Sequence, residues 1–186
     1  MRPEDVQADF PGTTPVPDLL VKLCAFTEEN GTPTIVGDLR LTDSGRSDAL
    51  AWFDDDHKEA DQFVIVAVDR RLSLYGYWQY EKQSLDQAPI VYLDSEATGN
   101  TVLTTTLDEF LALLALGPKL NDLGKGWPDV PESSDTTQRY RTWLHNQVGI
   151  ETPRDGHAIV AHARSTHPSL DAFVDQWAES AGTSDD

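Results

Sequence analysis

Hydrophobic residues change their spacing several times along this chain, and each spacing predicts a different element. From Pro17 to Glu29, leucine and phenylalanine recur every three or four positions, which predicts a helix that Asn30-Gly31 brings to an end. The segment Thr34–Leu41 places apolar residues at alternate positions, which predicts a strand. Residues 1–16 are rich in proline, threonine and acids, and we expect them to be flexible.

The middle of the chain predicts a sheet. Phe63–Val68 is continuously apolar, which indicates a strand inside a sheet, and the aromatic-rich Leu72–Tyr80 predicts the next strand. Asp69-Arg70-Arg71 between them is short enough for a hairpin turn but lacks the usual glycine. Ile90–Leu93 predicts a further strand, and Thr101–Thr105 predicts a short strand or an extended lead-in to the next helix. Residues 42–62, which precede these strands and are largely polar and acidic, predict no regular element.

The helix after the sheet carries the clearest local signal. The Thr106 hydroxyl can accept a hydrogen bond from the amide of Glu109 while the Glu109 carboxylate reaches back to the amide of Thr106, which is a capping box. Leucine and phenylalanine then line one helical face, and Gly117-Pro118 ends the helix. This segment therefore predicts a helix packed on the sheet.

The C-terminal part predicts additional helices. A connector rich in glycine, proline and aspartate, 118–134, leads into helices predicted over Asp135–Val148 and Pro168–Ser180. Ala158–Ala161 between them fits either a strand or a helix, and we expect residues 181–186 to be disordered. The chain therefore divides into a flexible segment 1–16, an α+β domain 17–123 and a helical extension 124–186 packed on the same core.

Composition narrows the class of protein. The 186 residues suit one domain with an appendage, and the longest apolar run is too short to span a bilayer. The N-terminus has acids and prolines where a secretory signal needs an apolar stretch, so we expect a cytoplasmic protein without a membrane partner. Cys24 is the only cysteine, which excludes an intrachain disulfide, and its apolar neighbours favour a buried structural role.

Net charge narrows the class of partner. With 32 acidic and 14 basic side chains the formal net charge is -18, which repels nucleic-acid phosphates and anionic lipids. The same charge attracts basic proteins and speeds their encounter. Solubility alone, or an acid-rich proteome, explains the charge equally well. Lysine and arginine are too sparse for a nucleic-acid footprint.

Two groups of residues have the chemistry of metal ligands. The acidic stretch Asp54–Asp61 could hold Ca²⁺ or Mg²⁺, but it lacks the pattern of an EF-hand loop, which favours a solvated loop or a patch that faces a partner. His157, His162 and His167 recur every fifth residue. On a helix this spacing separates them by about 140°, which suits a single metal poorly. We therefore assign no metal, cofactor or catalytic residue.

Two other groups could form a binding or reaction site. Asp94 and Glu96 flank Ser95 at a strand end, where a role in the turn is favoured over the paired carboxylates of a glycosidase. Aromatic residues gather around the predicted sheet, where core or cross-strand packing is favoured over an interface, with at least one of them exposed. They are Trp52, Tyr75, Tyr77, Trp78 and Tyr80.

Taken in order, these segments resemble the SUKH superfamily, which is similar to the yeast cell-wall synthesis regulator domain. The likeness covers about residues 17–117 and is strongest in Phe-Val-Ile-Val-Ala-Val-Asp, Ser-Leu-Tyr-Gly-Tyr-Trp, Ala-Pro-Ile-Val-Tyr-Leu-Asp-Ser-Glu and Thr-Leu-Asp-Glu-Phe-Leu-Ala-Leu-Leu. It implies an α+β fold with a twisted, mainly antiparallel sheet packed against helices, to which the C-terminal helices are an addition. Members usually carry glycines where this chain has Asp69-Arg70-Arg71, so the surface around that turn is expected to differ.

The resemblance also implies a function. Many bacterial members are immunity proteins that bind and block a polymorphic toxin, and toxins that attack nucleic acids tend to be basic, which fits an acidic inhibitor. We therefore expect a non-enzymatic protein that binds a basic toxin, while a regulatory scaffold of the same fold and a metal-dependent hydrolase stay open. The sequence leaves the oligomeric state open. The expected contact residues are Asp54, Asp55, Asp56, Glu59, Asp61, Glu81, Asp86, Asp94 and Glu96.

Overall fold

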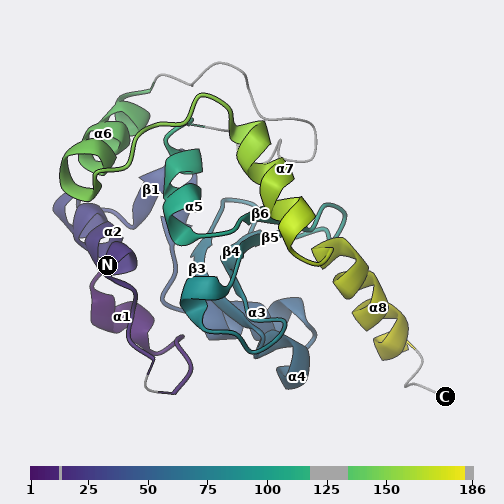
Figure 1. Cartoon of the computed structure of the whole chain (residues 1–186). Helices are drawn as coiled ribbons and strands as arrows, with labels where there is room; N and C mark the ends of the chain where they lie inside the picture. Colours follow the sequence, from purple (N-terminus) through teal and green to yellow (C-terminus); the bar gives the residue numbers. More distant parts are fainter. Residues whose placement is uncertain (13, 118–133, 183–186) are drawn as a thin grey trace.

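A six-stranded antiparallel sheet forms the centre of the protein (Figure 1). The computed structural model describes residues 1–12, 14–117 and 134–182. Each strand pairs with its neighbours in the sequence, so the sheet is an uninterrupted meander. The strands are β1 (Thr34–Val36), β2 (Leu39–Leu41), β3 (Phe63–Val68), β4 (Leu74–Trp78), β5 (Ile90–Leu93) and β6 (Thr101–Thr104).

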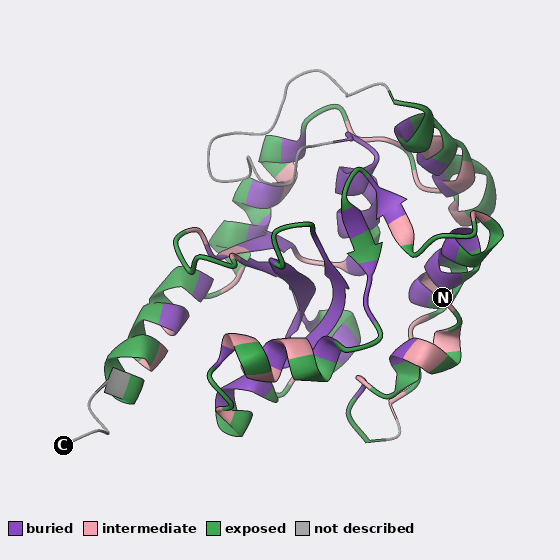
Figure 2. Cartoon of the chain, turned by 180° about the vertical axis from the view of Figure 1, so that it is seen from behind, coloured by how far each residue is buried: buried purple, intermediate pink, exposed green. Residues whose placement is uncertain are grey.

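Helices cover both faces of the sheet, so β3, β4 and β5 are buried at every position (Figure 2). One core packs the sheet against α1 (Pro3–Gln7), α2 (Asp18–Glu29), α5 (Leu107–Leu114) and α6 (Asp135–Trp143). The other core packs it against α3 (Gly45–Trp52), α4 (His57–Ala60) and α8 (Leu170–Gly182). Helix α7 (Gly156–Thr166) lies along β6 and contributes Val160 to the first core and Ala163 to the second. The predicted α+β class with an antiparallel sheet is confirmed.

The apolar run of β3 serves both cores because successive side chains of a strand point to opposite faces of the sheet, and a bulge shifts this alternation once. Val64 faces the first core, whereas Phe63 and Ile65 face the second. The register with β4 then skips one residue between Ile65 and Ala67. The skip places Ala67 in the first core and returns Val68 to the second. Since β3 lies between β2 and β4, its predicted place inside the sheet is confirmed.

Two predictions about the chain before β3 are wrong. The single strand expected over Thr34–Leu41 is a hairpin of β1 and β2, because Gly37 adopts a positive φ of 59° and turns the chain. Residues 42–62, for which no element was expected, form α3 and α4. Helix α3 begins so close to β3 that a Cβ on Gly45 would lie 2.2 Å from the Ile65 carbonyl oxygen. Close packing, rather than an apolar period, therefore holds this helix.

The ends of the chain are more regular than expected. Residues 1–16 contain α1, and Val6 and Phe10 are buried in the first core. Asp9 Oδ1 accepts a hydrogen bond of 2.9 Å from the amide of Arg46, which ties this segment to the start of α3. At the other end, Ala181 belongs to α8, while residues 183–186 lie outside the described part. The burial of Val6 and Phe10 orders the N-terminal segment, and the composition of the segment does not reveal this contact.

The helical predictions after the sheet hold with small changes. Thr106 caps α5 as expected, but the Glu109 carboxylate accepts a 2.9 Å bond from the amide of Thr105 rather than that of Thr106. Helix α6 continues into a π-helical turn, Leu144–Val148, which ends at Gly149. Ala158–Ala161 is helical, as part of α7. The C-terminal helices pack on both cores, whereas the expected boundary at 123 and 124 lies outside the described residues.

Candidate functional site

The surface carries two large grooves of similar size on opposite faces of the sheet. The acidic groove, of about 790 Å³, lies where α3 and α8 meet the β3–β4 and β5–β6 turns. The helix groove, of about 770 Å³, lies between α2 and α6. The two have different linings, and only the acidic groove is lined by a residue, Asp54, of the acidic stretch that the sequence singles out.

Two tryptophans form one wall of the acidic groove. Trp52 ends α3 and Trp177 lies on α8, and their ring centroids are 6.0 Å apart. The Trp52 indole nitrogen donates to the backbone oxygen of Asp94 at 3.0 Å, and the Trp177 indole nitrogen donates to Asp56 Oδ2 at 3.3 Å. Because both indole N–H groups are already paired, these half-buried side chains offer a partner ring surface rather than donors.

The β3–β4 turn forms the opposite rim. This turn has no glycine, and hydrogen bonds to a buried carboxylate hold its backbone. Asp69 is fully buried, and its Oδ1 accepts from the amides of Arg71 at 2.8 Å and Ser73 at 3.0 Å. Its Oδ2 accepts from the Tyr75 hydroxyl at 3.3 Å, and burial together with this carboxylate raises the pKa of Tyr75. The turn holds Leu72 at a φ of 67° with 65% of its surface exposed.

Backbone strain concentrates at this groove. Five non-glycine residues in the described part have a positive φ, and three of them, Asp54, Leu72 and Ala97, line the groove. A fourth, Asp55, follows Asp54 in the chain. Such conformations cost roughly 1–2 kcal/mol for most residues, although aspartate tolerates them better. Strain of this kind gathers at binding and catalytic sites, which singles out the acidic groove.

The charge inside the acidic groove is predominantly negative. Its lining contains three aspartates, Asp43, Asp48 and Asp54, and two arginines, Arg40 and Arg71. Asp48 is half-buried and accepts a 2.9 Å hydrogen bond from the Thr42 hydroxyl. Burial raises the pKa of Asp48 despite this hydrogen bond. The groove therefore holds one carboxylate, that of Asp48, that is incompletely solvated and that a cation would stabilise.

Five of the nine expected contact residues lie at or beside this groove. Asp54 and Asp55 are exposed, and so is Glu96, which sits in the β5–β6 turn between two lining residues. Asp56 caps α4 through Oδ1 and also holds Trp177. Asp94 accepts from Tyr92 and Thr98, so its carboxylate organises the turn, as the sequence favours.

The other four lie elsewhere. Glu59 is buried and accepts hydrogen bonds from Lys58 and Gln62. Asp61 forms an exposed ion pair of 2.8 Å with Arg46. Glu81 lies in the loop after β4, and Asp86 lies in η1 (Leu85–Gln87), at the mouth of a separate small pocket. The nine residues therefore do not form one surface.

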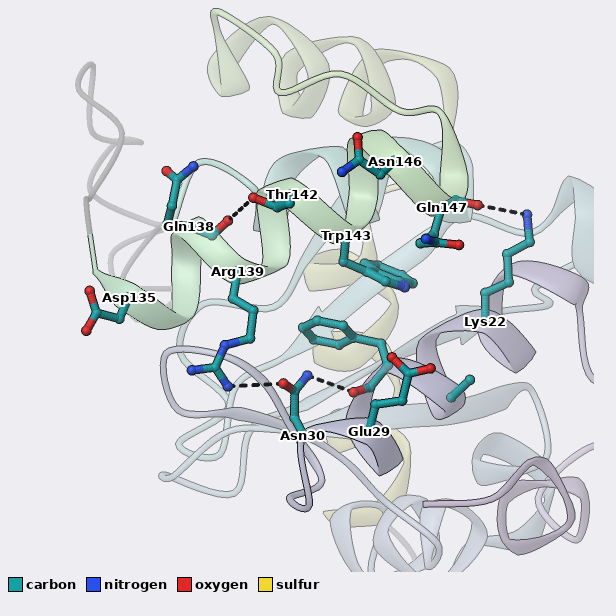
Figure 3. Close-up of a pocket in the computed structure, with 12 residues that line it drawn as sticks. Lys22, Glu29, Asn30, Asp135, Gln138, Arg139, Thr142, Trp143, Asn146 and Gln147 are labelled. Atoms are coloured by element: carbon teal, nitrogen blue, oxygen red, sulfur yellow. Dashed lines mark hydrogen bonds between the residues drawn. The ribbon is translucent and has the colours of Figure 1, made fainter.

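The helix groove has an aromatic floor and a polar rim (Figure 3). The rings of Phe26 and Trp143 lie with centroids 4.7 Å apart, and Trp143 points from α6 toward α2. On the rim, Arg139 donates to Asn30 Oδ1 at 3.0 Å, and Lys22 donates to a backbone oxygen of the π-helical turn at 3.4 Å. These contacts join the C-terminal helices to the first core and engage both basic side chains of the groove.

The histidines do not meet at one point. His157 and His162 are exposed on α7, whereas His167 follows that helix and its Nδ1 lies 3.2 Å from the Tyr80 hydroxyl. Burial and the neighbouring His162 lower the pKa of His167. Among the described residues, no group of three or more histidine, cysteine or acidic side chains is placed to hold a metal ion.

The acidic groove includes residues that the sequence patterns do not single out. The apolar period assigns Trp177 to the packed face of its helix, and alternation assigns Leu72 to a strand face. Its arginines, Arg40 and Arg71, belong to no basic cluster. One sequence signal for this rim was available. The short turn before Leu72 has no glycine, so a non-glycine residue has to take the left-handed conformation that tight hairpin turns require.

Comparisons with protein-family models, curated proteins and solved structures find no match to this chain. In the described residues, no helix has the length and apolar character needed to cross a membrane.

Proposed function

We propose that this chain is a non-enzymatic binding protein that neutralises a basic protein toxin by docking it against the acidic groove. The observation that carries the proposal is one groove in which carboxylates, two tryptophan rings and an exposed leucine meet on strained loops. The identity of the partner as a toxin comes from the resemblance to the SUKH superfamily. The six-stranded antiparallel sheet agrees with the architecture that this resemblance implies.

The groove has the parts that a protein interface needs. Leu72, Trp52 and Trp177 supply apolar surface at its rim and wall, and tryptophan is enriched among the few residues that contribute most of the binding free energy in interfaces. The surrounding acids and the net charge of -18 attract a basic partner over a distance and favour one orientation of it. Binding then blocks the toxin by covering its basic surface, without any bond being made or broken.

Neutralising the acids tests this proposal. The triple variant Asp43→Asn, Asp54→Asn, Asp55→Asn removes three charges, and asparagine also accepts the positive φ of the last two positions. We expect its affinity for a basic toxin encoded beside this gene to fall at least tenfold, mainly through slower association, and its protection of cells that express the toxin to fail. Titration calorimetry and a growth assay measure these effects.

A matched triple variant around the helix groove provides the control. Glu28→Gln, Glu29→Gln, Asp135→Asn changes the net charge by the same amount on the other face of the sheet. We expect its affinity to change less than threefold. Equal losses in both variants, or no binding between the chain and any neighbouring basic toxin, contradict the proposal.

A further inference from the structure

A small pocket on the first-core side of the sheet combines a buried phenol with three carboxylates. This Tyr77 pocket, of about 300 Å³, lies between the starts of α2 and α5 and the η1 turn. Asp18, Asp86 and Asp108 are exposed at its mouth, and Tyr77 of β4 lies among its lining residues. Its volume is at the lower end for ligand pockets and suits a single side chain.

Tyr77 brings a hydroxyl without a protein partner to this pocket. Only 2% of its surface is exposed, and in the described part of the chain its hydroxyl makes no hydrogen bond. The other fully or nearly buried tyrosines of the core, Tyr75, Tyr92 and Tyr140, each donate to a neighbour. The Tyr77 oxygen is not among the described side-chain atoms that are both fully buried and unpaired, so it reaches the space of the pocket and is available to bond a ligand there.

Charge decides which ligand fits. The N-terminus of each adjoining helix contributes about half a positive charge, whereas the three carboxylates contribute three negative ones. The pocket is therefore negative by about two charges and selects a cation. Burial raises the pKa of Tyr77, and Asp108 raises it further, so the phenol stays protonated and its oxygen accepts a hydrogen bond from such a cation.

Geometry decides which cation fits. No described group of three acidic or histidine side chains converges closely enough for a metal ion, so the carboxylates are spread around the mouth. A guanidinium has five donors in a planar fork and reaches separated acceptors, whereas an ammonium is a point charge. Leu19, Leu85 and Leu107 line the pocket as well and would cover the alkyl stem.

We propose that the Tyr77 pocket binds an arginine side chain. The inference rests on the proposed function in taking this arginine from the basic partner. The guanidinium pairs with the carboxylates at the mouth, and the Tyr77 oxygen accepts one of its hydrogen bonds.

A peptide titration tests the pocket without the partner. The full chain, labelled with ¹⁵N, is titrated with a blocked pentapeptide that has arginine between alanines, and with peptides in which lysine or citrulline replaces the arginine. We expect the arginine peptide to shift the amide signals of Leu107 and Asp108 and to saturate in the millimolar range, at about −4 kcal/mol. The lysine peptide should bind at least threefold more weakly, and the citrulline peptide should cause no shift.

Variants separate the pocket from general attraction to an acidic surface. Tyr77→Phe and Asp108→Asn should each weaken the arginine peptide at least threefold, while Asp175→Asn on the distant helix α8 removes one charge and should leave it unchanged. Equal binding of the citrulline peptide, or shifts confined to the acidic groove, overturn the inference. So does unchanged binding to Tyr77→Phe.

The two proposals fail separately. If the arginine peptide does not bind but the acidic-groove triple variant still loses the toxin, only the pocket inference is overturned. If no basic toxin binds the chain but the peptide titrates as expected, the proposed function is overturned and the pocket stands as an arginine site.

Discussion

The acidic groove and the helix groove are nearly equal in volume but differ in what their side chains already contact. In the helix groove, Lys22 and Arg139 are engaged with acceptors on the neighbouring element, and the aromatic floor joins two helices. In the acidic groove, Asp54 and Leu72 are exposed on strained backbone. The difference is that the contacts of the helix groove join two layers of the fold, whereas the acidic groove also presents an exposed leucine and an exposed carboxylate on strained backbone.

A substitution at the rim of the acidic groove is expected to have the largest effect on stability. Asp69→Ala removes the acceptor of two turn amides and leaves them without partners, so we expect the free energy of unfolding to fall by about 3 kcal/mol. Toxin binding should fall as well, because the turn no longer presents Leu72. Urea unfolding measures the first effect.

The matched variant Asp69→Asn keeps an oxygen acceptor and should recover more than half of the lost stability. If alanine and asparagine destabilise the protein equally, the turn does not depend on the hydrogen bonds of Asp69.

The two half-buried tryptophans compare the grooves directly. Trp177→Ala and Trp143→Ala each remove one indole from a groove, and each should destabilise the protein by about 2 kcal/mol, since both rings also pack on a core. Only Trp177→Ala should weaken toxin binding, by about tenfold, because only its ring faces the proposed interface. Thermal unfolding and calorimetry measure the two effects. A binding loss with Trp143→Ala instead would place the interface on the helix groove.

The smallest expected effect is a pH dependence at Asp48. Its raised pKa means that the folded state holds the Asp48 proton more tightly than the unfolded state, so wild-type stability from this group is lost as pH rises. Asp48→Asn removes this loss and still accepts from Thr42. The variant should match the wild type below the ordinary value of 3.8 and become the more stable protein toward neutral pH. Urea unfolding at several pH values measures it, and a variant less stable at neutral pH would contradict it.

Much of the fold could be predicted because it rests on local signals. The capped helix at Thr106, the continuous apolar β3 and the helical period of α2 all appear in the sequence as they appear in the structure. Helix α3 could not be predicted, because it depends on the close approach of Gly45 to β3 rather than on an apolar stripe. The hairpin of β1 and β2 could not be predicted, because Gly37 falls at a position that also fits the alternation of a single strand.

The candidate site was predictable only in part. The acidic stretch brings Asp54 and Asp55 to the groove, but Glu59 turns inward within the same stretch because a short helix intervenes. The wall formed by Trp177 lies far along the chain from Trp52, and only the folded chain brings the two together. Sequence patterns report the period of an element, whereas a groove depends on how separate elements meet.

Helix α7 has a consequence for how the molecule comes apart. Its residues Val160 and Ala163 are three positions apart, on one turn of helix, yet they belong to different cores. Neither layer of helices can therefore loosen without disturbing the other through this shared turn. Amide hydrogens on both sides of the sheet should exchange with solvent through a common global opening, and a protease should find no half of the protein that survives alone.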